Sequence, residues 1–220
     1  MSGRLIVIGD IHGCHEEFEI LLETLAPERA DRVVLLGDLV NRGPDSHRVI
    51  QLARKHATAA LLGNHELRLL NYRKTDDPTH LKPYDHATLD ALDRPSWDYL
   101  ARMRLTYEDR QHGIVLVHGG FLPDVPWRSQ PARIVTRIQV VDSLGEARKR
   151  SEAPRAKPWA DLWRGPPFVI YGHTPRPEVV RTKWTMGIDT ACVLGGCLTA
   201  VVLPGFEIVQ VKARKQYYHP

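Results

Sequence analysis

Five short glycine-containing motifs follow apolar runs in order along the chain, and each carries residues that can bind a metal ion. They are residues 9–13 (GDIHG), 37–43 (GDLVNRG), 63–66 (GNHE), 118–120 (HGG) and 172–174 (GHT). Any one of them can occur by chance in a soluble protein. In an α/β sheet, however, polar residues directly after the strands meet at one edge. Together the motifs therefore favour a fold that gathers these loops around one site.

The apolar runs predict an α/β fold. Strands are expected at 4–8, 32–36, 58–62, 114–117 and 168–171, and helices at 16–25, after an N-cap at Ser46, from 67 and at 97–103. The alternating order in the first half is typical of parallel strands joined by crossovers. Runs at 187–190, 198–203 and 207–212, with a turn at Pro204 and Gly205, predict a C-terminal β-meander.

The length and composition predict one domain. The chain has 220 residues, 43% of them hydrophobic, which is enough for one core over 1–220. The stretch from 72 to 94 is polar and lacks a clear period, so an irregular insert or cap is expected around 72–104. Residues 132–141 are equally compatible with a helix and with extended chain, and 149–158 are expected to form a surface loop.

Charge and cysteine content bear on partners and compartment. A net charge of +4 permits an anionic substrate without proving one. No apolar run approaches the length of a membrane span, and the start of the chain does not resemble a signal peptide. Three cysteines, none of them in a CxxC pair, favour reduced thiols, with core packing rather than metal binding as the expected role of Cys192 and Cys197. These features predict a cytoplasmic protein without a membrane partner.

The polar residues of the motifs suggest a metal centre. Six side chains offer carboxylate, amide or imidazole donors: Asp10, His12, Asp38, Asn64, His118 and His173. Singly, each has an ordinary explanation as a helix cap, a turn residue or a core histidine. As a set they exceed the needs of one tetrahedral zinc ion. They suit two divalent transition-metal ions, manganese first and iron, cobalt, nickel or zinc as alternatives, that share one carboxylate.

The motifs resemble those of the phosphoprotein-phosphatase family of calcineurin-like metallophosphoesterases, whose pattern is GDxHG, GDxVDRG, GNHE, HGG and GH. The resemblance runs from residue 9 to 174 and implies a β-sandwich flanked by helices, with a βαβαβ core. It also implies hydrolysis by a hydroxide held between two metal ions. The implied ligands of the first metal are Asp10, His12 and Asp38, and those of the second are Asp38, Asn64, His118 and His173. His65 would be the general acid, and Arg42 would grip the substrate phosphate.

One residue departs from the family pattern, because Asn41 stands where an Asp is usual. A neutral residue there is implied by the resemblance to bacterial symmetrical diadenosine tetraphosphatases and related ApaH-like phosphatases. The C-terminal signature of that subgroup resembles residues 187–190 (GIDT), 195–196 (GG) and 198–200 (LTA), with Ala191 and Cys197 differing.

The chemistry of Asn41 favours the same subgroup. An amide can orient the ring of His65, but it cannot stabilise the imidazolium as a carboxylate does. A leaving group that departs through a phosphate oxygen, with a pKa of about 6, barely needs a proton. Asn41 therefore favours cleavage of phosphoanhydrides over cleavage of phosphoserine.

The leading functional hypothesis is hydrolysis of dinucleoside polyphosphates, with diadenosine tetraphosphate cut into two ADP. A serine/threonine or tyrosine protein phosphatase and an enzyme of RNA 5′-end processing remain open, because one metal core serves all three. A non-catalytic phosphate reader is disfavoured by the complete ligand set. No RNA-binding signature is present, so no obligate nucleic-acid partner is expected.

The sequence says less about the roles of two further residues and about the oligomeric state. Arg164 is either a second phosphate clamp or a surface arginine. Glu66 is expected to support Arg42 or His65 by hydrogen bonding. The sequence leaves the oligomeric state open.

Overall fold

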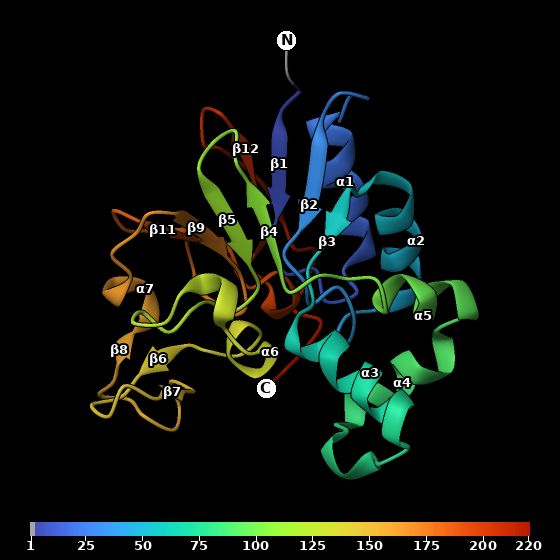
Figure 1. Cartoon of the computed structure of the whole chain (residues 1–220). Helices are drawn as coiled ribbons and strands as arrows, with labels where there is room; N and C mark the ends of the chain where they lie inside the picture. The colour runs from blue at the N-terminus through green and yellow to red at the C-terminus, as the bar shows by residue number, and fades with distance from the viewer. Residues whose placement is uncertain (1–2) are drawn as a thin grey trace.

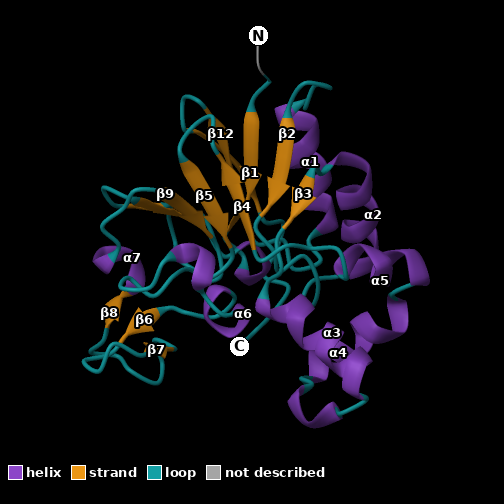
Figure 2. Ribbon diagram, in the orientation of Figure 1, coloured by secondary structure: helices purple, strands orange, loops and turns teal. Residues whose placement is uncertain are grey.

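The computed structural model describes residues 3–220 and shows two mixed β-sheets packed face to face, with helices outside them (Figures 1 and 2). The first sheet has the order β13-β12-β1-β2-β3, formed by Glu207–Lys212, Cys197–Leu203, Leu5–Ile8, Arg32–Leu35 and Ala59–Ala60. The second has the order β10-β11-β9-β5-β4, formed by Val180–Arg181, Thr185–Gly187, Phe168–Tyr171, Ile114–Val117 and Thr106–Asp109. The expected β-sandwich flanked by helices is confirmed.

Parallel pairing brings the motif loops to one edge of each sheet. β1 is parallel to β2, and β2 is parallel to β3. In the second sheet β5, β9 and β11 are parallel neighbours. Antiparallel strands complete both sheets, with β12 beside β1 and β4 beside β5. The loops that follow β1, β2, β5 and β9 therefore emerge at strand ends, where polar ligands collect.

Strand alternation divides the apolar residues among three layers. Leu5 and Val7 of β1 point into the interior between the sheets, where they meet Leu116 and Ile170 of the second sheet. Ile6 and Ile8 point to the opposite face, which the helices cover. This division follows from the two-residue period of a strand. A third cluster lies on the outer face of the second sheet around Phe121 and Trp159.

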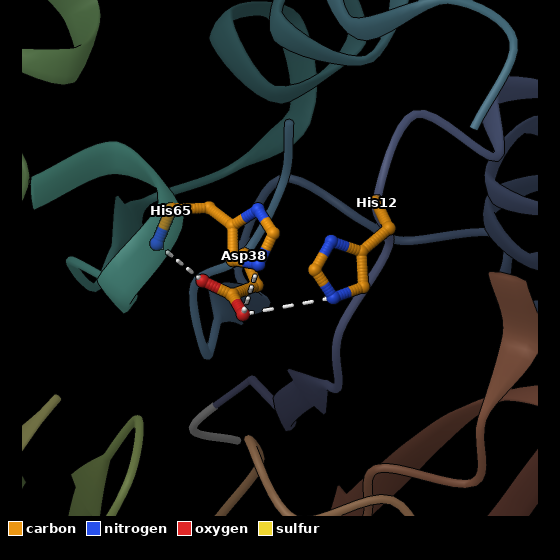
Figure 3. Close-up of side chains that lie close together, drawn as sticks. All are labelled: His12, Asp38 and His65. Atoms are coloured by element: carbon orange, nitrogen blue, oxygen red, sulfur yellow. Dashed lines mark hydrogen bonds and ion pairs between the residues drawn. The ribbon is translucent and has the colours of Figure 1, made fainter. Parts of the chain in front are cut away.

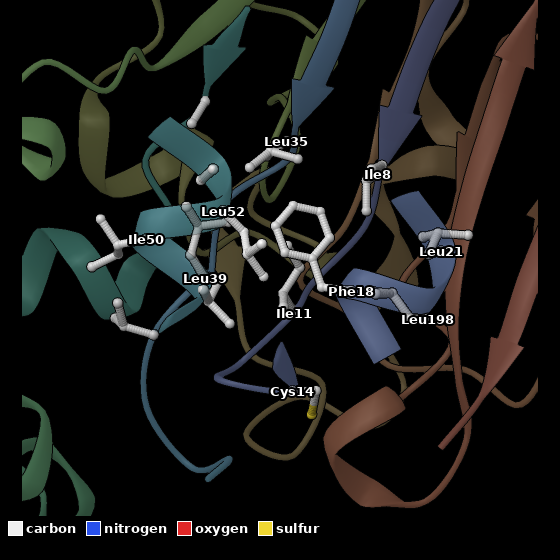
Figure 4. Packing of buried hydrophobic residues seen from close by; sticks show 14 of the residues in the cluster. Ile8, Ile11, Cys14, Phe18, Leu21, Leu35, Leu39, Ile50, Leu52 and Leu198 are labelled. Atoms are coloured by element: carbon white, nitrogen blue, oxygen red, sulfur yellow. The ribbon is translucent and has the colours of Figure 1, made fainter. Parts of the chain in front are cut away.

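Two helices cover the outer face of the first sheet. α1 (His15–Leu25) buries Phe18, Leu21, Leu22 and Leu25, the positions that the helical period predicts. α2 (Ser46–His56) lies beside it (Figure 4). The N-cap of α2 is Asp45, which accepts a hydrogen bond from the Arg48 N–H at 2.8 Å. The expectation of Ser46 as the cap was wrong, because the Ser46 hydroxyl accepts the N–H of Asn41 instead.

The segment expected to be an irregular insert is helical. It contains the end of α3 (Asn64–Thr75), a 3-10 turn at Pro78–His80, α4 (Pro83–Ala91) and α5 (Arg94–Leu100). The only buried residues of α4 are Asp85 and Thr88, so its inward face is polar and has no apolar period. The helices begin at positional signals instead, with Pro83 opening α4 and Asp93 capping α5.

Three other segments differ from expectation. The predicted C-terminal meander was wrong in part, since β11 joins the second sheet and only β12 and β13 form a hairpin. Residues 132–141 contain both α6 (Ala132–Val135) and β6 (Val140–Val141). The expected surface loop ends in β8 (Lys157–Pro158), which pairs with β6 beside β7 (Ala147–Arg148), and α7 (Trp159–Leu162) follows. Within residues 3–220, no helix combines the length and apolar character that crossing a membrane requires.

Replacement of Phe18 by Ala tests the packing of α1 on the first sheet. Phe18 is fully buried, so we expect the variant to lose about 3–5 kcal/mol of unfolding free energy from lost contacts and the cavity left behind. Urea unfolding followed by circular dichroism measures the loss. Leu144→Ala is the control, because that side chain is 80% exposed and its removal should cost less than about 0.5 kcal/mol. Equal losses in both variants would contradict the assignment.

Candidate metal centre

The predicted ligands converge at the strand ends. Asp10 and His12 follow β1, Asp38 follows β2, and His118 and His173 follow β5 and β9. Four of these five are almost completely buried, with at most 5% exposure for Asp10, His12, Asp38 and His118. Asn64 was expected to end the third strand, but it is the first residue of α3. Its side chain still reaches the cluster, since its Oδ1 lies 3.3 Å from Nε2 of His118.

Asp38 is the centre of the cluster. Its Oδ2 lies 3.6 Å from Nε2 of His12 and 3.9 Å from Nε2 of His65 (Figure 3). The same oxygen lies 3.4 Å from Nε2 of His118. Two groups of potential metal donors share this carboxylate, and the donor atoms within each group lie within 4.8 Å of one another. One group adds His12 and His65, and the other adds His118 and His173. A shared carboxylate is what two adjacent metal ions require.

Backbone carbonyls set the orientation of the imidazoles. Nδ1 of His12 is 3.1 Å from the Val40 carbonyl, and Nδ1 of His118 is 2.9 Å from the Leu36 carbonyl. A carbonyl only accepts, so Nδ1 carries a hydrogen in both rings, and Nε2 of each ring faces Asp38. This arrangement is the one found around metal-bound histidines. His173 is reversed, because its Nε2 donates to the carbonyl of Arg137 at 3.1 Å and leaves Nδ1 for a metal.

The donor set fits divalent cations. Nε2 of His118, Oδ2 of Asp38 and Oδ1 of Asn64 converge although all three can act as acceptors. A proton or a metal ion between them would reconcile them. In the protein alone a proton does so: burial lowers the pKa of His118, but Asp38 and Asp10 outweigh burial and raise it to about 10. A metal ion would replace that proton.

Charge at the centre is divided between the protonated ring of His118, the neutral rings of His12 and His173, and the ionised carboxylate of Asp38. Burial lowers the pKa of His12 to about 4 and that of His173 to about 3, so both rings are neutral near pH 7, as metal ligation requires. Burial alone would raise the pKa of Asp38. The imidazoles of His118 and His65 reverse that effect and hold it well below the usual range.

Asp10 and Asp189 form the other side of the pocket. Asp10 accepts the N–H of His173 at 3.1 Å, and it lines the same pocket as His12 and Asp38 without belonging to either three-donor group. Asp189 was not among the predicted site residues, although it belongs to the GIDT sequence at 187–190. It lines this pocket, and burial raises its pKa to about 6.

Several site residues have strained backbones. Positive φ angles, which non-glycine residues adopt rarely, occur at His12 (48°), Asp38 (48°), Asn41 (73°), Arg42 (71°) and His173 (65°). Such strain persists only where surrounding interactions enforce it, and it is concentrated at functional sites. No residue type in the motifs signals this strain, because the left-handed positions are not glycines.

Glu66 holds the loop that carries Asp38. Its buried carboxylate accepts four backbone N–H groups at 2.7–3.2 Å, from Asp38, Leu39, Val40 and Gly63. The expectation that Glu66 supports Arg42 or His65 was wrong. Its role is to satisfy the backbone where the β2 loop meets the start of α3.

A buried polar network orients His65. Nδ2 of Asn41 lies 3.0 Å from Nδ1 of His65 and 2.8 Å from Oδ1 of Asp85. Because a carboxylate only accepts, Asp85 fixes which end of the Asn41 amide faces it. The amide therefore donates to His65, whose proton lies on Nε2 toward Asp38. Arg68 neutralises Asp85 through hydrogen bonds at 2.7 and 2.8 Å.

Arg42 stands beside the metal ligands, whereas Arg164 does not. NH1 of Arg42 lies 3.3 Å from Nε2 of His12, and its guanidinium lies over the rings of Tyr84 and Tyr218 at 5.5 and 5.0 Å. Arg164 instead donates to the carbonyl of Asp161 and lines a different pocket. This exposed position favours the other expectation for Arg164, a surface arginine, over a second phosphate clamp.

Fold and site together define a metallophosphoesterase. The family model described as calcineurin-like phosphoesterase matches residues 3–197, and the chain belongs to this family. It is 31% identical to a protein of Halalkalibacterium halodurans named bis(5'-nucleosyl)-tetraphosphatase PrpE, asymmetrical, over 95% of this chain and 94% of that protein. A Bacillus cereus protein of the same name is 30% identical over 93% and 92%. A crystal structure described as "a putative diadenosine tetraphosphatase" has a TM-score of 0.85 and 32% identity, covering 97% of this chain and 95% of that one.

The shared carboxylate makes a testable distinction between ligands. We expect Asp38→Asn to lose both metal ions, because both donor groups use Asp38, and His173→Gln to lose only one. Metal content by inductively coupled plasma mass spectrometry, after loading with manganese, measures the difference. Activity should fall by more than the roughly 10–100-fold that loss of an outer partner costs. His112→Gln is the control, since that ring pairs with Asp109 away from the centre. Retention of two ions by Asp38→Asn would contradict the shared site.

Proposed function

We propose that the protein is a dinuclear metal-dependent hydrolase of dinucleoside polyphosphates that cuts its substrate asymmetrically. The observation that carries the proposal is the neutral network behind His65, in which Asn41 replaces the carboxylate usual in the family and donates to the ring. The name of a relative that is 31% identical to this chain supports the substrate class.

Each site residue has a defined task in this proposal. Asp10, His12 and Asp38 would hold one metal ion, and Asp38, Asn64, His118 and His173 the other. Two divalent cations would supply an activated water nucleophile and offset the charge of the phosphate. Arg42, positioned between the ring of Tyr84 and that of Tyr218, binds phosphate oxygens through its planar fork.

His65 acts as a neutral hydrogen-bond donor. Burial lowers its pKa well below the usual value, with Arg42 and Arg68 adding to the effect. Its Nε2–H therefore donates a hydrogen bond to the leaving oxygen without delivering a full proton. A phosphate leaving group, whose pKa is about 6, needs no more than this, whereas a serine alkoxide does.

The surroundings of the metal centre differ on its two sides. A cavity beside it is lined by four basic side chains, Arg68, Lys82, Arg137 and Lys149, and by one carboxylate, Asp77. It adjoins the centre, because Arg68 contacts His65 and the carbonyl of Arg137 binds His173. The pocket of the centre itself includes the apolar residues Pro175, Ala191, Val193 and Leu194.

This asymmetry supports an unequal cut. The cationic cavity suits a chain of several phosphates, and the apolar wall suits a nucleoside attached to the scissile phosphate. The sequence alone led to an expectation of symmetrical cleavage, whereas the relatives' names specify asymmetrical cleavage. We therefore place the scissile phosphate next to one nucleoside, with three phosphates in the cavity.

Chromatography of the products from diadenosine tetraphosphate tests the proposal. We expect the manganese-loaded protein to release ATP and AMP in equal amounts. ADP as the sole product would restore the symmetrical cut and contradict the assignment of the cationic cavity. Turnover of phosphopeptides or of capped RNA in preference to the dinucleotide would contradict the substrate class. Asp38→Asn is the control for contaminating hydrolases.

Exchange of the network charges tests the role of Asn41. Asn41→Asp alone places a second carboxylate against Asp85, 2.8 Å from the present amide nitrogen, so it confounds charge with repulsion. The double variant Asn41→Asp/Asp85→Asn keeps the total charge and moves the carboxylate next to His65. We expect it to hydrolyse phosphoserine peptides at least about 10-fold better relative to diadenosine tetraphosphate, because the stabilised imidazolium can protonate an alkoxide. Asp85→Asn alone is the matched control, and an unchanged ratio in the double variant would contradict the argument.

A further inference from the structure

Behind the metal centre, a second group of potential ligands is buried where the start of α1 meets the loop before β12. It consists of Cys14, the N-cap of α1, Glu17 in the first turn, and Cys192, the first residue of the 3-10 turn Cys192–Leu194. Their exposures are 0%, 0% and 2%. The two sulfurs and a carboxylate oxygen all lie within 4.8 Å of one another. Figure 4 shows Cys14 at the margin of the apolar cluster.

Glu17 is only half satisfied in this position. Its Oε1 accepts the N–H of Arg214 at 3.0 Å and the hydroxyl of Tyr217 at 2.8 Å. Its Oε2 is buried and has no hydrogen-bond partner among the described residues. The guanidinium of Arg214 does not neutralise it, because that group pairs with Glu16 at 2.9 Å. A buried carboxylate oxygen without a partner is costly and calls for a cation.

We propose that Cys14, Glu17 and Cys192 bind a third metal ion, a thiophilic divalent cation of the zinc type, separate from the catalytic pair. Two thiolates and one carboxylate form a soft donor set that selects zinc over magnesium, calcium or manganese. Tetrahedral zinc with Zn–S distances of about 2.3 Å sets its sulfurs about 3.8 Å apart, so the observed grouping needs only small shifts.

Charge balance favours the replacement of the thiol protons by a metal ion. The hydrogen bond to Cys14 and burial raise the pKa of the Cys192 thiol. A divalent cation would displace the two thiol protons to solvent and form two metal–sulfur bonds and one metal–oxygen bond. The net charge of the buried cluster stays the same, while Oε2 of Glu17 gains the partner it lacks.

The ion would fasten the loop that lines the substrate pocket. Cys192 lies between Ala191 and Val193, and all three line that pocket. Cys14 follows the GDIHG motif, and Glu17 is bound to the segment at Arg214 and Tyr217. The metal would thus join the start of α1, the pocket loop and the C-terminal segment. Its role is positional, since none of its donors belongs to the catalytic set. Cys192 also packs in the apolar cluster beneath the helices, as the sequence suggested, so metal binding would add to that role.

Cobalt substitution of the full, reduced protein separates this site from the catalytic centre. Cobalt bound by thiolates gives a near-ultraviolet sulfur-to-metal charge-transfer band, which an oxygen and nitrogen site cannot give. We expect the band in the wild type, with about one additional zinc ion per chain when zinc replaces cobalt. Cys14→Ser and Cys192→Ser should abolish both signals, and Glu17→Gln should weaken binding by more than the roughly 10–100-fold that loss of an outer partner costs.

Cys197→Ser is the matched control, because that cysteine lies on β12 outside the cluster, and it should keep both signals. The wild-type spectrum decides the question even if the serine variants fail to fold. Absence of the band in the cobalt-loaded wild type would overturn the proposal. So would a disulfide between Cys14 and Cys192 in freshly purified protein without zinc. Neither result depends on hydrolytic activity, so failure here leaves the proposed function untouched.

Discussion

The carboxylate of Glu66 is the interaction on which the site depends. It accepts backbone N–H groups from the loop after β2 and from the turn that opens α3, and so joins the two segments that carry Asp38 and His65. Asp38 then accepts the N–H of His65 at 3.1 Å. The strained φ of 48° at Asp38 is maintained because the N–H groups of this loop already donate to Glu66. The central position of Asp38 in the cluster therefore rests on a residue that belongs to neither donor group.

The helical insert completes the chemistry of the centre. Its helix α4 sends Asp85 inward to fix the amide of Asn41, and it places Tyr84 against Arg42. A polar inward face is costly unless every group is paired, and Arg68 pairs Asp85 here. Where the family pattern has a carboxylate next to His65, this chain has the amide of Asn41, and the carboxylate of Asp85 lies one residue further from the ring. There Asp85 directs the hydrogen bond of the amide without contacting the ring of His65.

The sequence predicted those strands and loop positions that depend on local residue patterns. The bounds of β5, β9 and β13 agree with the apolar runs, and each motif lies after a strand or at a helix start because glycine and polar residues end apolar runs. The helices of the insert escaped prediction because α4 buries polar side chains. The sheet to which β11 belongs depends on nonlocal pairing with β9. The partners of Glu66 and Asp85 are set by tertiary contacts between segments 17–44 residues apart, which spacing along the chain does not reveal.

The ligands come from both halves of the sandwich. His12 and Asp38 follow strands of the first sheet, and His118 and His173 follow strands of the second. A metal ion held between them therefore adds cohesion across the apolar interior as well as chemistry. By mass action, each tenfold rise in free metal above the dissociation constant adds about 1.4 kcal/mol of folding free energy per site. The stability of this sandwich would thus depend on the concentration of free metal in its medium, and removal of the metal would loosen the fold at the edge where these side chains meet.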